Sequence, residues 1–272
     1  YVKYAGFFTQ LEYNTDKISA FIAATGSYTG YRREDPYTYF RYDETGVQEV
    51  TEYNQETDEY VTTEQFMYGV LSQKASSPGY NAKLGGSYAI TETNHIYLNA
   101  GAYSRAPFIR NVFPNYQNVL SNENLVNEKV EALEIGYRVR LPKASLDINM
   151  YHTKWKDKSI MSGPLLRPDG TEYRAFVRGL VETHDGIELE FRAKPLPYLE
   201  IGGLVSIGDW RWDNDVDAEI LDENTNEVID SMHIYSAGLK VSDAPQTQFG
   251  LQARMDLPKN FRMGASYVYN MN

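Results

Sequence analysis

Arginine and aromatic side chains in two segments of the chain are the residues best suited to bind a solute. The candidates are Arg105, Phe108, Arg110 and Tyr116 in one segment, and Trp210 and Trp212 in another. A guanidinium group pairs with anionic ligands, and aromatic rings stack on planar or apolar groups. Each group also has an alternative role. Arg105 could simply neutralise neighbouring carboxylates, and Trp210 and Trp212, together with Trp155, could anchor an interfacial aromatic belt.

An acidic run offers oxygen ligands for a calcium ion. Asp213, Asp215 and Asp217 are spaced like the opening of a calcium loop. An EF-hand also needs a glycine at its sixth position and a bidentate glutamate at its twelfth, where this chain has Ala218 and Asn224. We therefore expect a solvated acidic loop, with a weak calcium site as the alternative. Further along, 222–227 separates two short apolar pairs, which predicts a small hairpin.

The sequence favours a protein that is not an enzyme and has no cofactor. It has no cysteine, no Gly-x-Ser-x-Gly nucleophile elbow and no phosphate-binding glycine loop. Its four histidines are scattered, without the spacing of a metal-ligand pair. Glu188 and Glu190 share one face of a predicted strand, which indicates the lining of a wet lumen and not an acid/base pair.

Alternation of apolar and polar side chains with a period of two recurs along the chain and predicts an all-β fold. On one face of 144–151 lie Ala144, Leu146, Ile148 and Met150, and on the other Ser145, Asp147, Asn149 and Tyr151. We predict about ten strands near 3–13, 17–31, 79–90, 94–104, 129–140, 144–156, 178–193, 198–212, 246–256 and 260–272.

The connections between these strands are alternately short and long. Five short turns alternate with four long segments, near 32–78, 105–128, 157–177 and 213–245. This is the pattern of a transmembrane antiparallel β-barrel, with short periplasmic turns, long extracellular loops and outer-membrane lipid around it. No apolar run approaches the roughly 18 residues of a membrane-spanning helix, and a net charge of -11 argues against nucleic acid as a partner.

A soluble β-sandwich is the alternative, but it would have to bury the charged face of these strands at a cost of about several kcal/mol per unpaired ion. The odd number of connections also places the two chain ends on the extracellular side. We therefore expect 1–272 to be a single partial barrel domain, truncated at both ends.

Several stretches resemble the barrel of TonB-dependent outer-membrane receptors. Ser104-Arg105-Ala106-Pro107-Phe108 is similar to the family's Phe-Arg-Ala-Pro segment, and 122–128 to its Asn-Pro-x-Leu-x-x-Glu stretch, with Glu123 in place of Pro. Glu134-Ile135-Gly136-Tyr137 resembles its Glu-Leu-Gly-Tyr strand. Asp243 to Thr247 resembles its Ala-Pro-x-x-Thr entry to a strand. The ordered set of motifs covers about 95–272. Residues 1–94 share only the general character of such a barrel and contain none of these motifs.

The resemblance implies part of a barrel of about 22 strands that encloses a plug. It also implies binding of an extracellular solute through the loops and import driven by the TonB complex, which acts on a plug outside this chain. Siderophore, oligosaccharide and peptide stay open as solutes, and a surface lipoprotein stays open as a partner. Haem receptors of this family have a histidine between the two loop motifs, whereas this chain has none from Arg105 to Glu128, which argues against haem as the solute. The alternatives are a ten-stranded surface hydrolase, which needs a closed barrel, and a non-transporting surface or adhesion barrel.

Overall fold

The computed structural model describes residues 1–34, 47–54, 59–66, 72–113, 120, 126–168, 170, 172–222, 228–242 and 244–271. Ten long strands form one antiparallel sheet in the order β1-β2-β5-β6-β7-β8-β10-β11-β14-β15. Their bounds are β1 Val2–Asn14, β2 Ile18–Tyr31, β5 Ala75–Ala89, β6 Asn94–Arg105, β7 Glu128–Leu141, β8 Ala144–Met161, β10 Glu172–Leu196, β11 Leu199–Trp212, β14 Thr247–Asp256 and β15 Arg262–Met271. All ten predicted strands are therefore confirmed.

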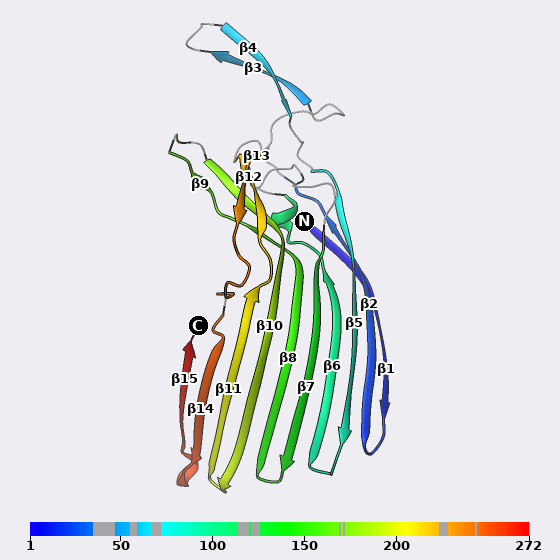
Figure 1. Cartoon of the computed structure of the whole chain (residues 1–272), viewed down its shortest axis with the longest axis vertical. Helices are drawn as coiled ribbons and strands as arrows, with labels where there is room; N and C mark the ends of the chain where they lie inside the picture. Colours follow the sequence, from blue (N-terminus) through cyan, green and yellow to red (C-terminus); the bar gives the residue numbers. More distant parts are fainter. Residues whose placement is uncertain are drawn as a thin grey trace.

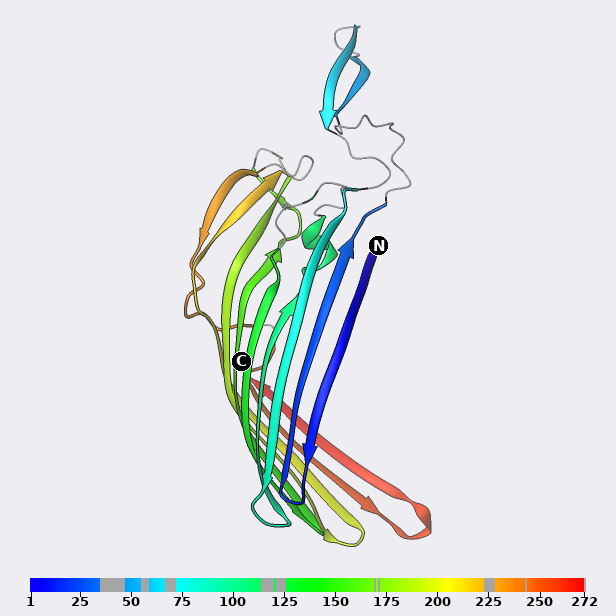
Figure 2. The ribbon, with the colours of Figure 1, turned by 90° about the vertical axis from the view of Figure 1, so that its right-hand side faces the viewer.

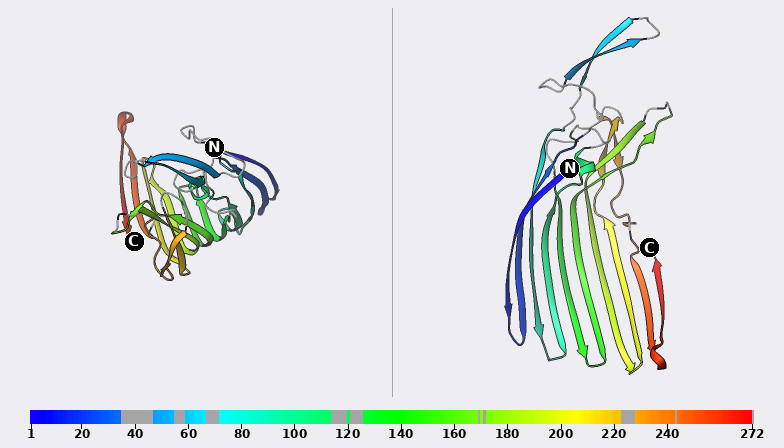
Figure 3. Two further views of the ribbon diagram at one scale, coloured as in Figure 1. Left: turned by 90° about the horizontal axis from the view of Figure 1, so that it is seen from above. Right: turned by 180° about the vertical axis from the view of Figure 1, so that it is seen from behind.

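The short turns lie together at one end of the sheet and the long connections leave from the other, as predicted (Figures 1 and 2). The sheet is an arc that does not close on itself (Figure 3). Within the described residues β1 pairs with β2 alone and β15 with β14 alone. A ten-stranded hydrolase would need these edges to meet, so the fold does not support that alternative.

The two faces of the sheet differ as the alternation predicted. Cross-strand partners continue each face from strand to strand. On the apolar side, one row of cross-strand partners runs from β2 to β8 through Ala20, Gly86, Leu98, Ile135 and Met150. On the polar side, the neighbouring row runs through Ser19, Ser87, Tyr97, Gly136 and Asn149. We call the apolar side the outer face and the polar side the inner face. The outer face suits lipid and the inner face suits a water-filled lumen.

The inner face is concave. The short helix α1 (Ile109–Val112) and its flanks lie on this side: Val112 and Phe113 pack against inner-face Tyr31 of β2. The Asn111 amide donates to the Ser159 carbonyl of β8 at 3.4 Å. β2 and β8 are separated by three strands, so the segment crosses the hollow of the arc. Within the described residues, no helix is long and apolar enough to cross a bilayer.

Two strands continue further outward than the sequence predicted. β8 extends to Met161, and β10 begins at Glu172 and runs for 25 residues. Positive φ angles at Asp157 and Gly179 accompany register shifts between these strands. Such irregularities change which face successive side chains occupy, so the alternation is interrupted where the prediction ended the strands.

The outer extension of β10 carries three short strands that belong to the same sheet but lie off its main row. β12 (Val216–Asp222) pairs with β10 and with β13 (Val228–Ile234), which confirms the predicted hairpin, and the short β9 (Leu165–Leu166) pairs with β10 as well. Ala175, Ala218 and Ile220 form the buried core of this extension. Burial lowers the pKa of Arg178 at its base, while Glu219, 3.3 Å away, opposes that shift.

The prediction did not include a second hairpin, β3 (Val47–Asn54) and β4 (Glu59–Phe66), within the first long connection. Its strands are rich in glutamate, threonine and tyrosine without a clear apolar face, so they lack the signal that marked the wall strands. At the opposite end, the turn between β14 and β15 is a 3-10 helix, η2 (Pro258–Asn260).

Candidate solute-binding site

The middle of the inner face is a continuous network of polar side chains. Glu134 of β7 accepts hydrogen bonds from Tyr97 at 3.2 Å, Asn99 at 3.2 Å and Asn149 at 2.9 Å. The Asn149 amide also lies 3.4 Å from Glu188 of β10. Hydrogen-bond donors therefore surround both carboxylates and stabilise their negative charge on a wall that faces water.

Lower on the same face, cations and carboxylates alternate. Arg138 and Arg140 of β7 both bind Asp147 of β8, at 2.7 and 2.8 Å. Arg192 pairs with Glu190 at 2.8 Å within β10. These groups line a polar cavity of about 750 Å³, which we call the lumen cavity and which extends upward to Trp210. Glu188 and Glu190 thus line the inner wall, as the sequence indicated.

A second cavity, of about 790 Å³, lies at the mouth between α1 and the outer ends of β2, β5, β6, β7 and β8. We call it the mouth cavity. Its lining includes Tyr31, Tyr103, Arg105, Phe108, Ile109 and Trp155. Two of the predicted site residues, Arg105 and Phe108, therefore lie together in one cavity.

Arg105 is held by neighbours on three sides. Its guanidinium binds Glu128 of β7 in an ion pair and lies 4.9 Å from the ring centroid of Phe108 and 5.7 Å from that of Trp155. Arg110 lies 5.8 Å from the same Phe108 ring. The ion pair joins the two motifs that carried the family resemblance, and it agrees with the alternative in which Arg105 neutralises a carboxylate.

Tyr31 fixes the other side of the mouth cavity. Its hydroxyl donates to the Pro107 carbonyl at 2.6 Å, and burial raises its pKa to about 12. Its ring packs against Val112 and Phe113. The contacts of Tyr31 therefore hold both ends of the 107–113 segment, which carries Phe108 and Arg110, against the inner wall.

A third group of side chains lies beside the lumen cavity, at the outer ends of β8, β10 and β11. Trp210 stacks on His184 with ring centroids 4.7 Å apart, and its indole N–H donates to the Tyr151 hydroxyl at 3.0 Å. The Lys158 ammonium binds Glu182 at 2.9 Å and lies 5.1 Å from the ring centroid of Trp212.

The belt interpretation of the tryptophans is wrong, because all three lie on the inner face. Trp210 pairs in register with His184, and Trp212 with Glu182, on the side of β10 that carries Glu188. Trp155 also pairs with Glu182. Counting by twos from Ser206 and from Asn149 would have assigned these positions to the polar side. Lys158 could not be placed by counting, because the irregularity at Asp157 intervenes.

The acidic run does not form a shared metal site. Asp213 accepts a hydrogen bond from Thr183 at 2.7 Å and pairs with Lys154 at 3.0 Å. The Asp215 carboxylate accepts from the Ala237 N–H, and Asp217 contacts His233. Across the described segments, no group of three or more such ligands converges. The calcium alternative therefore lacks support, and Tyr116, the remaining predicted site residue, lies outside the described residues.

Ion pairs also mark the upper edge of the outer face. Lys129 pairs with Asp157 at 3.1 Å, Lys156 with Glu131 at 2.9 Å and His152 with Asp185 at 2.7 Å. Hydrogen bonding and charge attraction from Lys156 lower the pKa of Glu131. These pairs begin directly above the apolar rows, where lipid contact would end.

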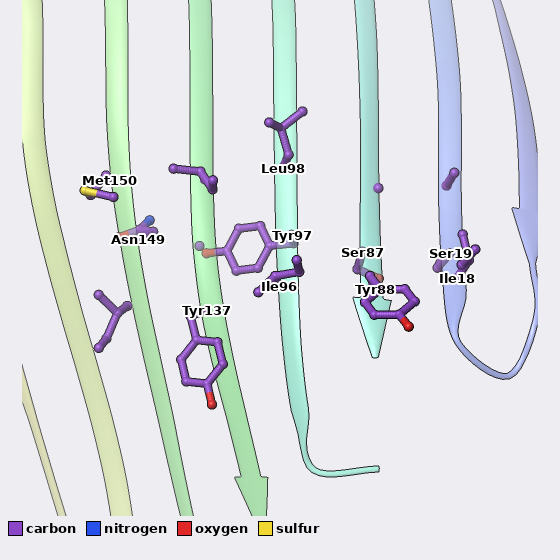
Figure 4. Close-up of a pocket in the computed structure, with 15 residues that line it drawn as sticks. Ile18, Ser19, Ser87, Tyr88, Ile96, Tyr97, Leu98, Tyr137, Asn149 and Met150 are labelled. Carbon is purple, nitrogen blue, oxygen red and sulfur yellow. The ribbon is translucent and has the colours of Figure 1, made fainter. Parts of the chain in front are cut away.

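A hollow of about 640 Å³ lies on the outer face (Figure 4). Its apolar rim includes Ile96, Leu98, Tyr88, Tyr137 and Met150. The rows that line it continue the apolar outer face, so it belongs to the lipid-facing wall. The candidate site therefore lies on the other side of the sheet.

Comparison with protein families gives a match over residues 2–272 to the model described as "TonB dependent receptor-like, beta-barrel". Among solved structures, the ferric-catecholate import receptor Fiu of E. coli K12 aligns with a TM-score of 0.55 at 15% identity, over 99% of this chain and 34% of that one. The copper transporter OprC aligns with a TM-score of 0.56 at 9% identity, over 98% of this chain and 39% of that one. The chain thus spans between a third and two fifths of their length. No curated protein matches.

Proposed function

The chain belongs to the TonB-dependent receptor-like β-barrel family of the bacterial outer membrane, and we propose that it is part of a transporter that imports an extracellular solute with TonB-derived energy. In this proposal the solute binds at the inner wall of the mouth. A plug domain outside the chain responds to TonB and releases the solute inward.

The observation that carries the proposal is the arrangement of the inner wall. Exposed binding groups in the mouth cavity, Arg105 and Phe108, stand above a lumen wall of paired charges such as Arg138 and Asp147. A solute that leaves the mouth would therefore move along a hydrated, charge-compensated surface, and not along an apolar one that would trap it.

The same arrangement favours binding over covalent chemistry. A surface hydrolase needs an acid and a histidine that converge at the mouth, but the His152–Asp185 pair lies on the outer face. On the inner face, His184 Nε2 lies 3.6 Å from Glu182, but this carboxylate is buried and binds Lys158, and the His184 ring is stacked on Trp210. The proposal accordingly assigns these groups to the structure of the wall.

A growth experiment with the complete receptor tests the proposal. A deletion strain with and without the receptor gene would be grown on neutral oligosaccharides as the carbon source, on a ferric catecholate as the iron source and on oligopeptides as the nitrogen source. Each test would be repeated in a strain that lacks TonB. We expect the gene to restore growth on one of these sources, and only where TonB is present. Restored growth without TonB, or no restoration on any source, would contradict the proposal.

A further inference from the structure

The mouth cavity presents positive charge and no negative charge to a ligand. Among the described residues that line the cavity, Arg105 alone carries a charge. Its side chain is 46% exposed, whereas its counterion Glu128 is only 9% exposed and is not part of the lining. A ligand in the cavity therefore meets guanidinium N–H groups, which are strong donors to anionic oxygens.

Two further cations flank the cavity without a carboxylate of their own. Arg110 lies 5.8 Å from the ring centroid of Phe108, and the Lys83 ammonium lies 5.3 Å from that of Tyr103. Both side chains are exposed, and neither forms an ion pair within the described part of the chain. Because Glu128 matches Arg105 alone, the surroundings of the cavity carry a net positive charge, which favours an anionic ligand.

The walls of the cavity are mainly apolar. Four aromatic rings and two aliphatic side chains line it: Tyr31, Tyr103, Phe108, Trp155, Ile109 and Val130. Such walls bind an apolar body, since both surfaces leave water. A polyanion would need several cations in the lining itself, where Arg105 is single and already matched. The ligand that fits is therefore an apolar group with an anionic group beside it.

Two polar side chains in the lining are available for further hydrogen bonds. The Asn81 amide and the Thr29 hydroxyl line the cavity, and neither is hydrogen-bonded within the described residues. Each can both donate and accept, as the N–H and C=O groups of a peptide require. A hydrocarbon carboxylate would leave these side chains unused.

The positions of these groups suit a short extended chain. Thr29, Asn81 and Arg105 lie on β2, β5 and β6, which are successive strands of the sheet. Two strand spacings amount to about 10 Å. An extended peptide of about three to four residues covers that length.

We infer that the mouth cavity binds a short peptide by its C-terminal end, with the carboxylate at Arg105 and Arg110 and an apolar last side chain against Phe108. The preceding peptide groups pair with Asn81 and Thr29. This inference rests on the proposed function, since it names the class of solute that the transporter takes.

Titration calorimetry with the purified complete receptor tests the inference. The probe is the tetrapeptide Ala-Ala-Ala-Phe. It is compared with its C-terminal amide, with Ala-Ala-Ala-Ser and with 3-phenylpropanoate, which keeps the ring and the carboxylate without peptide groups. Maltohexaose and a ferric tris-catecholate represent the other classes of solute. We expect the tetrapeptide to bind about tenfold or more tightly than each of these, because each lacks a contact that the site offers.

Arg110→Gln removes an unmatched cation at an exposed position, so the variant should fold. It should weaken binding of Ala-Ala-Ala-Phe about tenfold and leave the affinity for the amidated peptide unchanged. Phe108→Ala should instead weaken both peptides, because both carry the ring. Lys129→Gln is the matched control: Lys129 pairs with Asp157 on the outer face, and its loss should leave both affinities as in the wild type.

Absence of tetrapeptide binding, equal affinity for the free and amidated peptides, or wild-type affinity in Arg110→Gln overturns the inference. Tighter binding of 3-phenylpropanoate, maltohexaose or the catecholate than of the tetrapeptide does the same. TonB-dependent uptake of a solute other than a peptide would overturn the inference and leave the proposed function standing. Peptide binding with TonB-independent uptake would do the reverse.

Discussion

At the residue scale, the inner wall is built from side chains that satisfy one another across neighbouring strands. Asn149 bridges Glu134 and Glu188, and the Trp210 indole donates to Tyr151. Such networks fix side-chain positions, and in the proposed function this lowers the entropy cost of binding a solute. The pairing of Arg105 with Glu128 belongs to the same class: it holds the guanidinium against two rings.

Asp213 provides a prediction about pH. Partial burial opposes its ionisation, but the Thr183 hydroxyl and the Lys154 ammonium outweigh burial and lower its pKa below the ordinary 3.8. A carboxyl with a lowered folded-state pKa stabilises the fold above its unfolded pKa, and this contribution is lost as the pH falls through the folded value. Asp213→Asn should therefore cost about 0.5 kcal/mol at pH 7, and less at pH 3.

Urea unfolding of the detergent-solubilised receptor at the two pH values measures this difference. Asp209→Asn is the control, because Asp209 pairs with Arg211 on the same strand and both side chains are about half exposed. An Asp213→Asn cost that is as large at pH 3 as at pH 7 would show that the ionised carboxylate is not its source.

At the element scale, glycines on the inner face give space to tyrosine rings from the adjacent strand. A Cβ atom at Gly136 would lie 2.2 Å from the ring of Tyr97, and one at Gly186 would lie 2.4 Å from the ring of Tyr151. Both tyrosine hydroxyls belong to the polar network of the wall. The glycines are therefore required by the position of the rings and not by unusual backbone angles.

Gly136→Val should displace the Tyr97 ring and lower the free energy of unfolding by about 1–3 kcal/mol, the range for overpacking a filled site. Gly86→Ala serves as the control, because a Cβ atom there meets no atom closer than 3.5 Å. Unfolding curves of both variants decide the matter: equal stability of Gly136→Val and wild type would mean that the ring has room to move.

At the scale of the whole molecule, one sheet separates two environments. Met150 and Asn149 are adjacent in β8, yet Met150 belongs to the apolar outer row and Asn149 lies between two carboxylates on the inner face. The large apolar side chains of the outer face, exposed in the isolated chain, include Leu98, Ile135 and Met150. Lipid contact accounts for that exposure.

The same substitution at these two adjacent positions should have opposite consequences. Met150→Arg places a charge against lipid and should cost about 2 kcal/mol or more, whereas Asn149→Arg gains carboxylate partners and should change stability by less than about 1 kcal/mol. Folding yields and unfolding midpoints in lipid vesicles would compare them. A greater loss for Asn149→Arg would reverse the assignment of the faces.

The ten wall strands, their alternating faces and the sides on which short and long connections lie could all be predicted from the amino-acid sequence. These features depend on local periodicity and turn chemistry, which each segment carries within itself. The sequence also supplied Arg105, Phe108, Trp210 and Trp212 as candidates, although their ligand-binding roles stay predictions.

Tertiary structure alone decided which of these residues meet. Arg105 reaches Glu128 across 23 positions, and Lys158 reaches Glu182 across 24, because cross-strand register and the irregularities at Asp157 and Gly179 set those neighbours. Tryptophan fits both a membrane interface and a binding wall, so its residue type does not specify its face. Pairing with the adjacent strands does, because it fixes the direction of every side chain along them.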